Sequence, residues 1–355
     1  MNLIYRCIFA FVAAMGISFL FTPVAGKLAH LIGAIDDPAS SSRRVHDTPT
    51  PRLGGVAIFI GAAASILLFS YVPDQKLIGL FLGAIILVVM GTIDDANPLN
   101  AKLKLFVQFI AAGVLVAFGY RITFFTNFLG DLFGNTEIIH INIELISIFL
   151  TMTWIVAITN TVNFIDGLDG LATGVTTIAS LTLAYIAFSN QSYEAMIIMI
   201  IVAGSCLGFL PHNFNPAKIF MGDAGAYFLG FIMAATSIEG VLKGPTIMTL
   251  IVPMIALGLP IFDLTFAVVR RTINGQHPMQ ADRGHLHHRL LDIGLGKKRA
   301  VFVMYAISVM MGLSAIAFIN DNYVNMAVFV FFTMIMLYVP IARSISMKKE
   351  EEDVK

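Results

Sequence analysis

The chain has 355 residues, of which 57% are hydrophobic and only 12% are charged, and its mean hydropathy is +0.84. Soluble domains carry about 25% charged residues, so this composition excludes a soluble protein and indicates an all-α polytopic membrane protein. Lysine plus arginine and aspartate plus glutamate number 22 each. The formal net charge is therefore zero, and bulk charge indicates no nucleic-acid partner.

Apolar segments long enough to cross a bilayer follow one another along almost the whole chain. We predict about eleven spans, an odd number that places the two chain ends on opposite sides of the membrane. We expect one integral membrane domain over 1–342 and a charged cytoplasmic tail over 343–355. The predicted spans lie at about 3–29, 54–72, 77–93, 103–120, 143–162, 171–188, 194–211, 224–242, 246–269, 300–319 and 324–342.

Basic residues are distributed unevenly between the two sides that these spans define. One side receives Arg6, Lys76, Arg121 and Lys243, and the other receives the remaining 18 of the 22 lysines and arginines. Cytoplasmic loops are enriched in lysine and arginine. We therefore expect the N-terminus outside, the C-terminus inside, and any chemistry on the cytoplasmic side, where most polar motifs also fall.

The polar stretch 160–174 interrupts two apolar runs and carries Asn163, Asp166 and Asp169 at steps of three. On a helical path these side chains would lie near one face and converge. Its glycines, which would let backbone or ligand approach closely, are Gly167, Gly170 and Gly174. A membrane-embedded carboxylate costs about 2.5–3.5 kcal/mol, which a metal bridging phosphates would offset. The alternative is a polar helix break satisfied by neighbouring helices.

Two more carboxylate motifs stand at predicted span ends. Asp94 and Asp95 are adjacent and precede Lys104, so a shared cation would relieve their repulsion. The alternative is a solvated turn with ordinary cytoplasmic lysines. Asp223 lies between Gly222 and Gly225 where a helix begins, a place that favours phosphate. There the alternative is that Asp223 only caps the helix.

Two basic loops face the same predicted side. The stretch 282–289 places three imidazoles and two guanidiniums close together, a set that could clamp a diphosphate. A zinc site is disfavoured because the stretch has no cysteine and no HExxH helix. A merely basic, lipid-facing loop is the other alternative, with apolar residues dipping into the interface: Leu286, Leu290, Leu291 and Ile293. In the stretch 43–55, Gly54 and Gly55 would let the backbone approach a partner.

All of these clusters fall on one predicted membrane face. Acidic groups for a divalent metal, basic groups for phosphates and glycines at helix starts form one consistent set. We therefore expect a phosphorylated cytoplasmic substrate that reacts with a partner reached from the membrane.

These motifs resemble those of the polyprenyl-phosphate N-acetylhexosamine-1-phosphate transferases. The chain is most similar to the bacterial branch that transfers GlcNAc-1-phosphate to undecaprenyl phosphate. The resemblance covers nearly the whole chain and rests on His46-Asp-Thr-Pro-Thr-Pro-Arg-Leu-Gly-Gly55, Asp94-Asp95, Asn163-Phe-Ile-Asp-Gly-Leu-Asp-Gly-Leu-Ala172, Phe220-Met-Gly-Asp223 and His285-Leu-His-His288.

The resemblance implies that UDP-GlcNAc and undecaprenyl phosphate give undecaprenyl-diphospho-GlcNAc and UMP, with Mg²⁺ or Mn²⁺ as cofactor. It implies a bacterial inner membrane location, the first membrane step of O-antigen, common antigen or wall teichoic acid synthesis, and membrane lipids as further partners; a homodimer is compatible with it. The implied metal ligands are Asn163 and Asp223. The implied catalytic residues are Asp94, Asp95 and Asp166. The implied substrate contacts are Arg52, Lys104, Asp169, Phe220, Arg283, His285, His287 and His288.

A general base is not obligatory for such a reaction. A phosphate monoester has a second pKa of about 6, so the lipid acceptor is largely dianionic at neutral pH. Phosphoryl transfer depends mostly on positioning and on charge neutralisation. We expect Asp94 and Asp95 to act electrostatically at least as much as by removing a proton.

Four alternatives compete with this interpretation. Transfer of phospho-MurNAc-pentapeptide ranks second, because that branch typically carries three consecutive histidines, which Leu286 interrupts here. Another HexNAc donor, such as GalNAc, fits the same motifs. A CDP-alcohol phosphotransferase is disfavoured, because Thr173 stands where its Asp-Gly-X-Ala-Arg pattern needs arginine. An ion-coupled transporter would carry midplane carboxylates in repeated halves, and no repeat is visible.

Overall fold

Helices make up nearly all the regular structure of this chain. The computed structural model describes residues 2–37, 49–70, 74–122, 124–126, 138–140, 144–241, 248–273, 275 and 285–353. Within these residues, seven helices are long and apolar enough to cross a membrane, and Gly54–Phe69 is a shorter apolar helix. The predicted all-α polytopic membrane class is confirmed. The count of eleven spans and the orientation stay predictions.

Each predicted span coincides with one or two helices of the structure. The helices are α1 (Leu3–Ile32), α2 (Gly54–Phe69), α3 (Gln75–Ala96), α4 (Ala101–Ala117), α6 (Glu144–Ile165), α7 (Leu171–Ser189), α8 (Tyr193–Asn213), α9 (Gly222–Val241), α10 (Met248–Ala256), α11 (Gly258–Ile273), α12 (Leu286–Asp292), α13 (Lys297–Ile319) and α14 (Tyr323–Asp353). The last helix continues through most of the stretch predicted as a charged tail.

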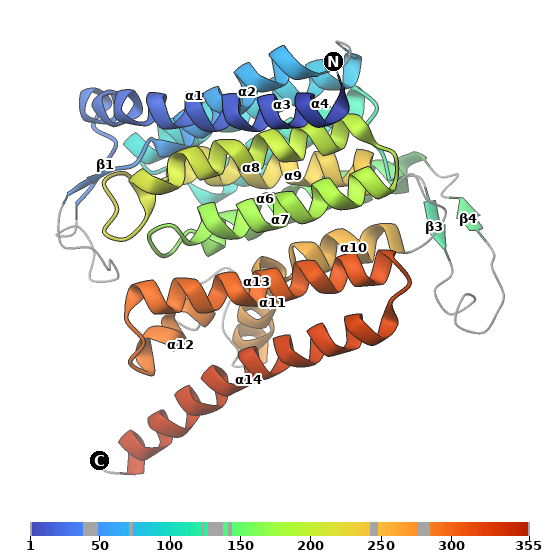
Figure 1. The fold of residues 1–355 in the computed structure, drawn as a ribbon. Coiled ribbons are helices and arrows are strands. Elements are labelled where there is room, and N and C mark those ends of the chain that lie inside the picture. The colour runs from blue at the N-terminus through green and yellow to red at the C-terminus, as the bar shows by residue number, and fades with distance from the viewer. Residues whose placement is uncertain are drawn as a thin grey trace.

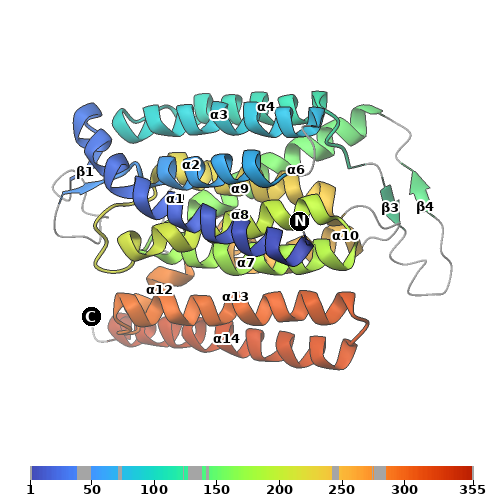
Figure 2. The same ribbon diagram turned by 45° about the horizontal axis from the view of Figure 1, so that its top comes forward.

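Most of these helices run side by side, so that their ends gather at two ends of a bundle (Figures 1 and 2). Helices α7, α8 and α9 form the interior, where most side chains are buried. Helices α13 and α14 pack against each other as a separate layer that contacts α7 and α10 through α13. The N-terminus lies at one end of the bundle and the C-terminal helix finishes at the other (Figure 1).

One predicted span is wrong in its continuity. Of the predicted span 246–269, the described residues 248–269 form two helices, α10 and α11, which meet at Leu257, and α11 turns away from α10 in Figure 1. Pro260 has no amide hydrogen, so the carbonyl of Ala256 loses its usual helical donor at this point. Pro253 within α10 weakens the same segment further.

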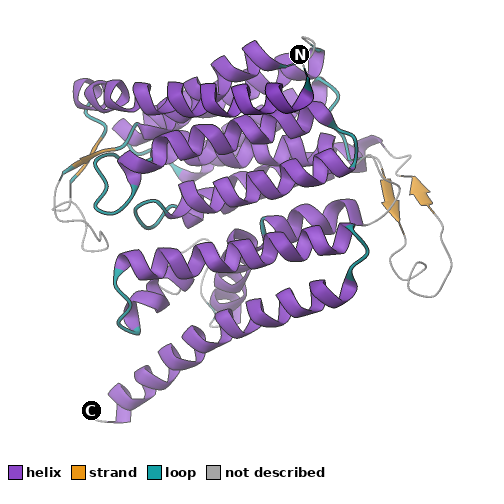
Figure 3. Cartoon of the chain, viewed as in Figure 1, coloured by secondary structure: helices purple, strands orange, loops and turns teal. Residues whose placement is uncertain are grey.

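Short strands occur at both ends of the bundle (Figure 3). Strand β1 (Ile35–Asp36) pairs antiparallel with β2 (Thr50–Pro51), and β3 (Phe124–Thr126) pairs antiparallel with β4 (Ile138–His140). The first pair matters for function, because it holds the residues that lead into α2 beside the start of α9.

Glycines let three helices meet closely around the start of α9. A Cβ on Gly55 of α2 would collide with the backbone of Gly225, and one on Gly91 of α3 would collide with the backbone of Ala224. The backbones therefore touch where any other residue would hold them apart. This contact brings the C-terminal end of α3 and the N-terminal end of α2 to the first turn of α9.

Candidate active site

The turn that leads into α9 is joined by backbone hydrogen bonds to the start of α2 and to the residues just before it. The amides of Gly54 and Gly55 donate to the carbonyls of Phe220 (2.9 Å) and Met221 (2.8 Å), and the Phe220 amide donates to the carbonyl of Pro51 (2.8 Å). The predicted close approach at Gly54 and Gly55 is confirmed, and its partner is this turn. The half-buried Phe220 therefore has its backbone fixed beside the site.

Asp95 is buried and caps α9. Its two carboxylate oxygens accept hydrogen bonds from the backbone amides of Asp223 (2.9 Å) and Ala224 (3.2 Å). Gly91 lies one helical turn earlier on the same face of α3, which explains how the Asp95 side chain reaches these amides. The capping role that the sequence suggested for Asp223 belongs to Asp95, so the Asp223 side chain is available for other contacts.

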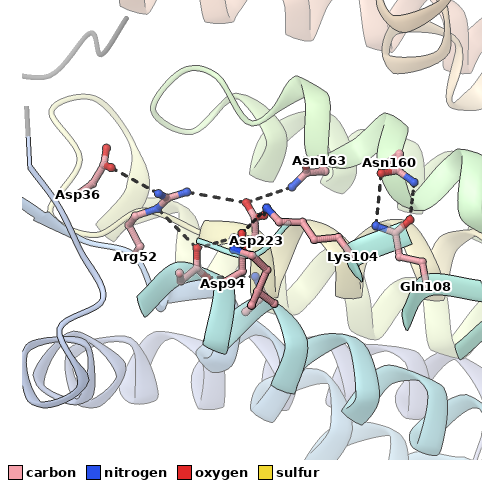
Figure 4. Close-up of polar contacts among 11 residues, drawn as sticks. Asp36, Arg52, Asp94, Lys104, Gln108, Asn160, Asn163 and Asp223 are labelled. Atoms are coloured by element: carbon pink, nitrogen blue, oxygen red, sulfur yellow. Dashed lines mark hydrogen bonds and ion pairs between the residues drawn. The ribbon is translucent and has the colours of Figure 1, made fainter. Parts of the chain in front are cut away.

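Arg52 contacts three carboxylates at the site (Figure 4). Its guanidinium nitrogens lie 3.4 Å from Asp36, 3.5 Å from Asp95 and 3.8 Å from Asp223. Burial acts to lower the pKa of Arg52, but the charges of Asp95, Asp223 and Asp36 outweigh it and raise that pKa. Arg52 is therefore a permanent positive charge whose side chain keeps 31% of its exposure, enough to meet a ligand.

Lys104 forms a second bridge on the opposite side of Asp223 (Figure 4). Its ammonium lies 2.5 Å from Asp94 and 3.1 Å from Asp223, and the Asp94 carboxylate also accepts the amide hydrogen of Leu99 (2.6 Å). The adjacent carboxylates therefore pair with different cations: Asp94 with Lys104, and Asp95 with Arg52. Lys104 is therefore a member of the cluster, which argues against the alternative that it is only an ordinary basic residue at the end of a span.

Asn163 approaches the cluster from the end of α6. Its side-chain amide donates to Asp223 at 3.3 Å. One turn earlier, Asn160 exchanges hydrogen bonds with Gln108, which lies one turn beyond Lys104 (Figure 4). This amide pair ties α4 to α6 and thereby holds Lys104 and Asn163 on either side of Asp223.

The residues around Asp223 fit a partial ligand set for Mg²⁺ or Mn²⁺. A carboxylate and a side-chain amide oxygen are the hard donors that these ions prefer, and Mg²⁺ is commonly bound by one or two carboxylates together with substrate phosphates. No cluster of three or more His, Cys, Asp or Glu side chains in the described part of the chain could hold a metal alone. The fit therefore requires a phosphate ligand to complete it.

The predicted helical path through Asn163, Asp166 and Asp169 is wrong beyond Ile165. Helix α6 ends there, and 166–170 forms a turn that finishes at Gly170 with φ of 78°, a left-handed conformation that favours glycine. Asp169 consequently points elsewhere. Its carboxylate accepts hydrogen bonds from the Asn215 side chain (2.8 Å) and the Ala217 amide (3.1 Å) in the loop before α9.

Asp166 lies in the turn, between the cluster and Asp169. Desolvation by the surrounding protein raises its pKa to about 7; the charge of Arg52 opposes this rise, and those of Asp223 and Asp169 add to it. Asp166 is thus a site carboxyl outside the helices whose proton can be gained or lost near neutral pH.

The histidine motif is docked on α11 by a buried carboxylate. Asp263 accepts hydrogen bonds from the Nδ1 atom of His285 (3.0 Å) and from the backbone amide of Leu286 (2.7 Å). His285 stacks on Phe164 with ring centroids 6.3 Å apart, and on His287 at 5.8 Å. Helix α12 is thereby placed beside the end of α6.

His287 faces Gly167 in the turn, where a Cβ would collide with the imidazole. Burial and the neighbouring His288, whose ring centroid lies 4.2 Å away, lower the pKa of His287 to about 3. His287 is therefore a neutral imidazole at physiological pH. The suggested insertion of the leucines into the lipid interface is wrong for Leu286 and Leu290, because both are buried in the protein core.

The structure brings together most of the predicted site residues. Asp94, Asp95, Arg52, Lys104, Asn163 and Asp223 form one connected cluster; Asp166 lies next to it, and His287 packs on the turn that carries Asp166 and Asp169. Arg283 lies outside the described residues, as does His46.

Sequence reasoning missed several residues that hold the site together. Asp263 sits within a predicted span, and an ionisable residue there is by itself a signal of function. Asn213 accepts hydrogen bonds from Gly170 and Thr173, and Tyr305 donates to the Gly170 carbonyl. The sequence offers no comparable signal for these two, because their partners are distant in the chain.

An acidic cluster bound by Arg52 and Lys104, with histidines packed beside it at one end of a bundle of membrane-length helices, defines a polytopic membrane enzyme suited to phosphorylated substrates. Comparison with known proteins supports this class of enzyme. The family model "Glycosyl transferase family 4" matches residues 77–241. A probable undecaprenyl-phosphate N-acetylglucosaminyl 1-phosphate transferase of Bacillus subtilis (strain 168) is 38% identical over 98% of this chain and 94% of its own.

Two further relatives bear on the branch. A decaprenyl-phosphate N-acetylglucosaminephosphotransferase of Mycobacterium leprae (strain TN) is 34% identical over 81% of this chain and 78% of its own. A phospho-N-acetylmuramoyl-pentapeptide-transferase of Enterococcus faecalis (strain ATCC 700802 / V583) is 39% identical, but over 54% of this chain and 61% of its own. The chain belongs to glycosyl transferase family 4 and, within it, to the polyprenyl-phosphate N-acetylglucosamine-1-phosphate transferases, as its motifs predicted.

Proposed function

We propose that this protein transfers GlcNAc-1-phosphate from UDP-GlcNAc to undecaprenyl phosphate, giving undecaprenyl-diphospho-GlcNAc and UMP. The observation that carries the proposal is the placement of Asp223 between two fixed cations, Arg52 and Lys104, at the helix start where the family motifs meet. Relatives that match nearly the whole chain bear this activity in their names, whereas the pentapeptide-transferase relative matches about half of it.

Arg52 and Lys104 are the groups best suited to receive phosphate oxygens. Both are held by carboxylates before any substrate arrives, so little reorganisation is needed when the diphosphate binds. The transferred group spreads negative charge over its oxygens, and preorganised cations stabilise that charge. The neutral His287 beside the turn would donate a hydrogen bond without adding net charge.

Asn163 and Asp223 would hold the Mg²⁺ or Mn²⁺ ion, with the donor diphosphate completing its coordination. When bound, the ion supplies charge neutralisation on the phosphate oxygens. Asp169 and Phe220 are proposed to hold the uracil. The Asp169 carboxylate is held by the loop before α9, and the Phe220 backbone is held by Pro51 and Gly54 at the start of α2.

The two adjacent aspartates take different parts in this proposal. Both oxygens of Asp95 are engaged by α9, which favours a positioning role over proton removal. Asp94 orients Lys104. Because the lipid phosphate is largely dianionic at neutral pH, the attack on the donor phosphorus needs no strong base from either residue.

We further propose that the site faces the cytoplasm of a bacterial inner membrane, with the N-terminus outside, because 18 of the 22 basic residues then lie inside. The lipid product would begin a cell-surface polysaccharide: O-antigen, common antigen or wall teichoic acid. Membrane lipids surround the protein in this arrangement, and a homodimer is compatible with it.

The testing experiment is a transfer assay on the purified protein in detergent. It offers undecaprenyl phosphate and Mg²⁺ with either UDP-GlcNAc or UDP-MurNAc-pentapeptide, and follows UMP and the lipid product. We expect product from UDP-GlcNAc, lost in EDTA and in Asp223→Asn. Product only from the pentapeptide donor would move the protein to peptidoglycan synthesis. No UMP from either donor, alongside an active control enzyme, would contradict the transferase proposal.

A further inference from the structure

Helix α13 contacts the turn that carries Asp169. The Tyr305 hydroxyl donates a hydrogen bond of 2.5 Å to the carbonyl oxygen of Gly170. That carbonyl also accepts the amide hydrogen of Gly174 in the first turn of α7 at 2.9 Å, so the tyrosine occupies its second acceptor position. Gly170 is buried and has the left-handed φ of 78°, so the hydroxyl is bonded to the point at which the turn ends and α7 begins.

The Tyr305 ring fits against α7 because Gly174 makes room for it. A Cβ on Gly174 would collide with this ring, so α13 approaches α7 at this point only because the position is glycine. Helices α13 and α14 form a layer beside the rest of the bundle, and α13 packs on α7 (Figure 2). The tyrosine is therefore a polar contact between this layer and the turn.

The same face of α13 also contacts the loop that holds Asp169. Phe302 lies three residues before Tyr305, and the two rings pack edge to face with centroids 6.1 Å apart. Phe302 packs in turn against Phe214 at the end of α8, with centroids 5.8 Å apart. The next residue, Asn215, donates the 2.8 Å hydrogen bond to the Asp169 carboxylate. One face of α13 therefore contacts both of the segments that this hydrogen bond joins.

An open basic cavity adjoins the same hydrogen bond. It has a volume of about 410 Å³ and is lined by Asn215 and by residues 296–299 at the start of α13. Lys298 and Arg299 are exposed there. Positive charge around an open cavity favours an anionic substrate, so the Asp169 side of the site suits a nucleotide.

We propose, on the basis of the proposed function in which Asp169 holds the uracil, that Tyr305 and Phe302 are positioning residues for the donor nucleotide. They hold the turn at Gly170 against the loop before α9 and thereby fix the Asp169 carboxylate. Lys104 is held on α4 by separate contacts. Loss of the α13 contacts is therefore expected to weaken donor binding more than acceptor binding or the transfer step.

The experiment measures the KM for UDP-GlcNAc and the KM for undecaprenyl phosphate separately in Tyr305→Phe, which keeps the ring and removes only the hydroxyl. We expect the donor KM to rise about three- to tenfold, the effect of one lost hydrogen bond, with the acceptor KM and kcat unchanged. Tyr338→Phe is the matched control, because Tyr338 is an exposed tyrosine of α14 in the same layer. A smaller fraction of folded enzyme lowers the apparent kcat and leaves KM unchanged, so partial unfolding cannot produce this pattern.

Direct binding of UMP tests the same point without turnover. Its dissociation constant in the presence of Mg²⁺ is measured by calorimetry and is expected to rise by the same factor in Tyr305→Phe, and in the same direction in Phe302→Leu. In an Asp169→Asn background, Tyr305→Phe should add little, because both changes act on one contact. An unchanged donor KM, an equal rise in both KM values, or full additivity with Asp169→Asn would overturn the role of α13.

The unaltered protein is measured first, so that failure of the proposed function is recognised separately. If it forms UMP from UDP-GlcNAc and the donor KM of Tyr305→Phe does not change, only the role of α13 is wrong. If the unaltered protein neither forms UMP nor binds it, the proposed function and the role of α13 are both wrong.

Discussion

Asp95 accepts the backbone amide hydrogen of Asp223 at 2.9 Å, so one carboxylate of the site holds the other in place through the start of a helix. The second Asp95 oxygen accepts the amide hydrogen of Ala224. Because the first amides of a helix have no partner within it, this side chain completes α9 and fixes the direction in which Asp223 leaves the chain. The Asp95 side chain therefore contributes to both the fold and the site.

Asp95→Asn is expected to lower both stability and turnover. The variant amide can accept only one of the two backbone hydrogens and no longer neutralises Arg52, a loss of about 1–2 kcal/mol. Denaturation temperature and transfer rate in detergent report the two effects. The rate loss is expected to persist at pH 9, where the acceptor phosphate is fully ionised. Recovery of the rate at high pH would instead assign proton removal to Asp95.

Lys104→Met is expected to lower kcat/KM by about 10²–10³-fold, because it removes a preorganised cation and leaves Asp94 and Asp223 facing each other. Lys104→Arg should recover part of the rate. Lys102→Met is the matched control, since Lys102 is exposed on the same helix turn. If both methionine variants lost activity equally, general electrostatic attraction would explain the role of these lysines.

Asp263→Asn is expected to lower turnover at least about tenfold without abolishing it. The variant weakens the buried hydrogen bonds by which the Asp263 carboxylate orients His285 and docks α12. A hydrogen bond to a charged group is worth about 1.5–3 kcal/mol. Steady-state kinetics check this prediction. Asp292→Asn, at the end of α12, is the control. Unchanged kinetics in Asp263→Asn, with the chain still folded, would remove His285 from the site.

The transfer rate is expected to rise with pH around neutrality. The pKa of Asp166 is raised to about 7, mainly by desolvation, so this carboxyl is protonated below that pH and negatively charged above it. The acceptor phosphate titrates at about 6. In Asp166→Asn, the residual activity should therefore rise with a midpoint near 6 rather than near 7. An unchanged midpoint in the variant would show that Asp166 does not control the profile.

Gly55→Ala is expected to destabilise the protein by about 1–3 kcal/mol and to reduce activity, because its methyl group would meet the backbone of Gly225 and push α9 away. Gly16→Ala in α1 has open space around the new methyl group and serves as control. Denaturation temperatures of both variants test this. Equal stability of the two would mean that α2 and α9 can separate without strain.

Much of this protein could be predicted from the residues in order. Apolar runs of membrane length identify helices because a backbone in lipid must satisfy its own hydrogen bonds. Charged motifs at the ends of those runs mark the reactive end, since carboxylates and cations are retained near a membrane only with partners or a function. The acidic and histidine motifs, Gly54 and Gly55, and the family were all found in this way.

Tertiary structure decided which partner each group takes. The sequence suggested only Asp223 as a cap of α9, and it is the close contact at Gly91 that brings Asp95 to the first amides of this helix. The turn after Ile165 separates Asp169 from Asn163, and Asp263 reaches His285 from another helix. Local sequence sets where helices begin and end, whereas contacts between distant segments depend on how close the helices can pack, and that emerges only when the whole bundle is assembled.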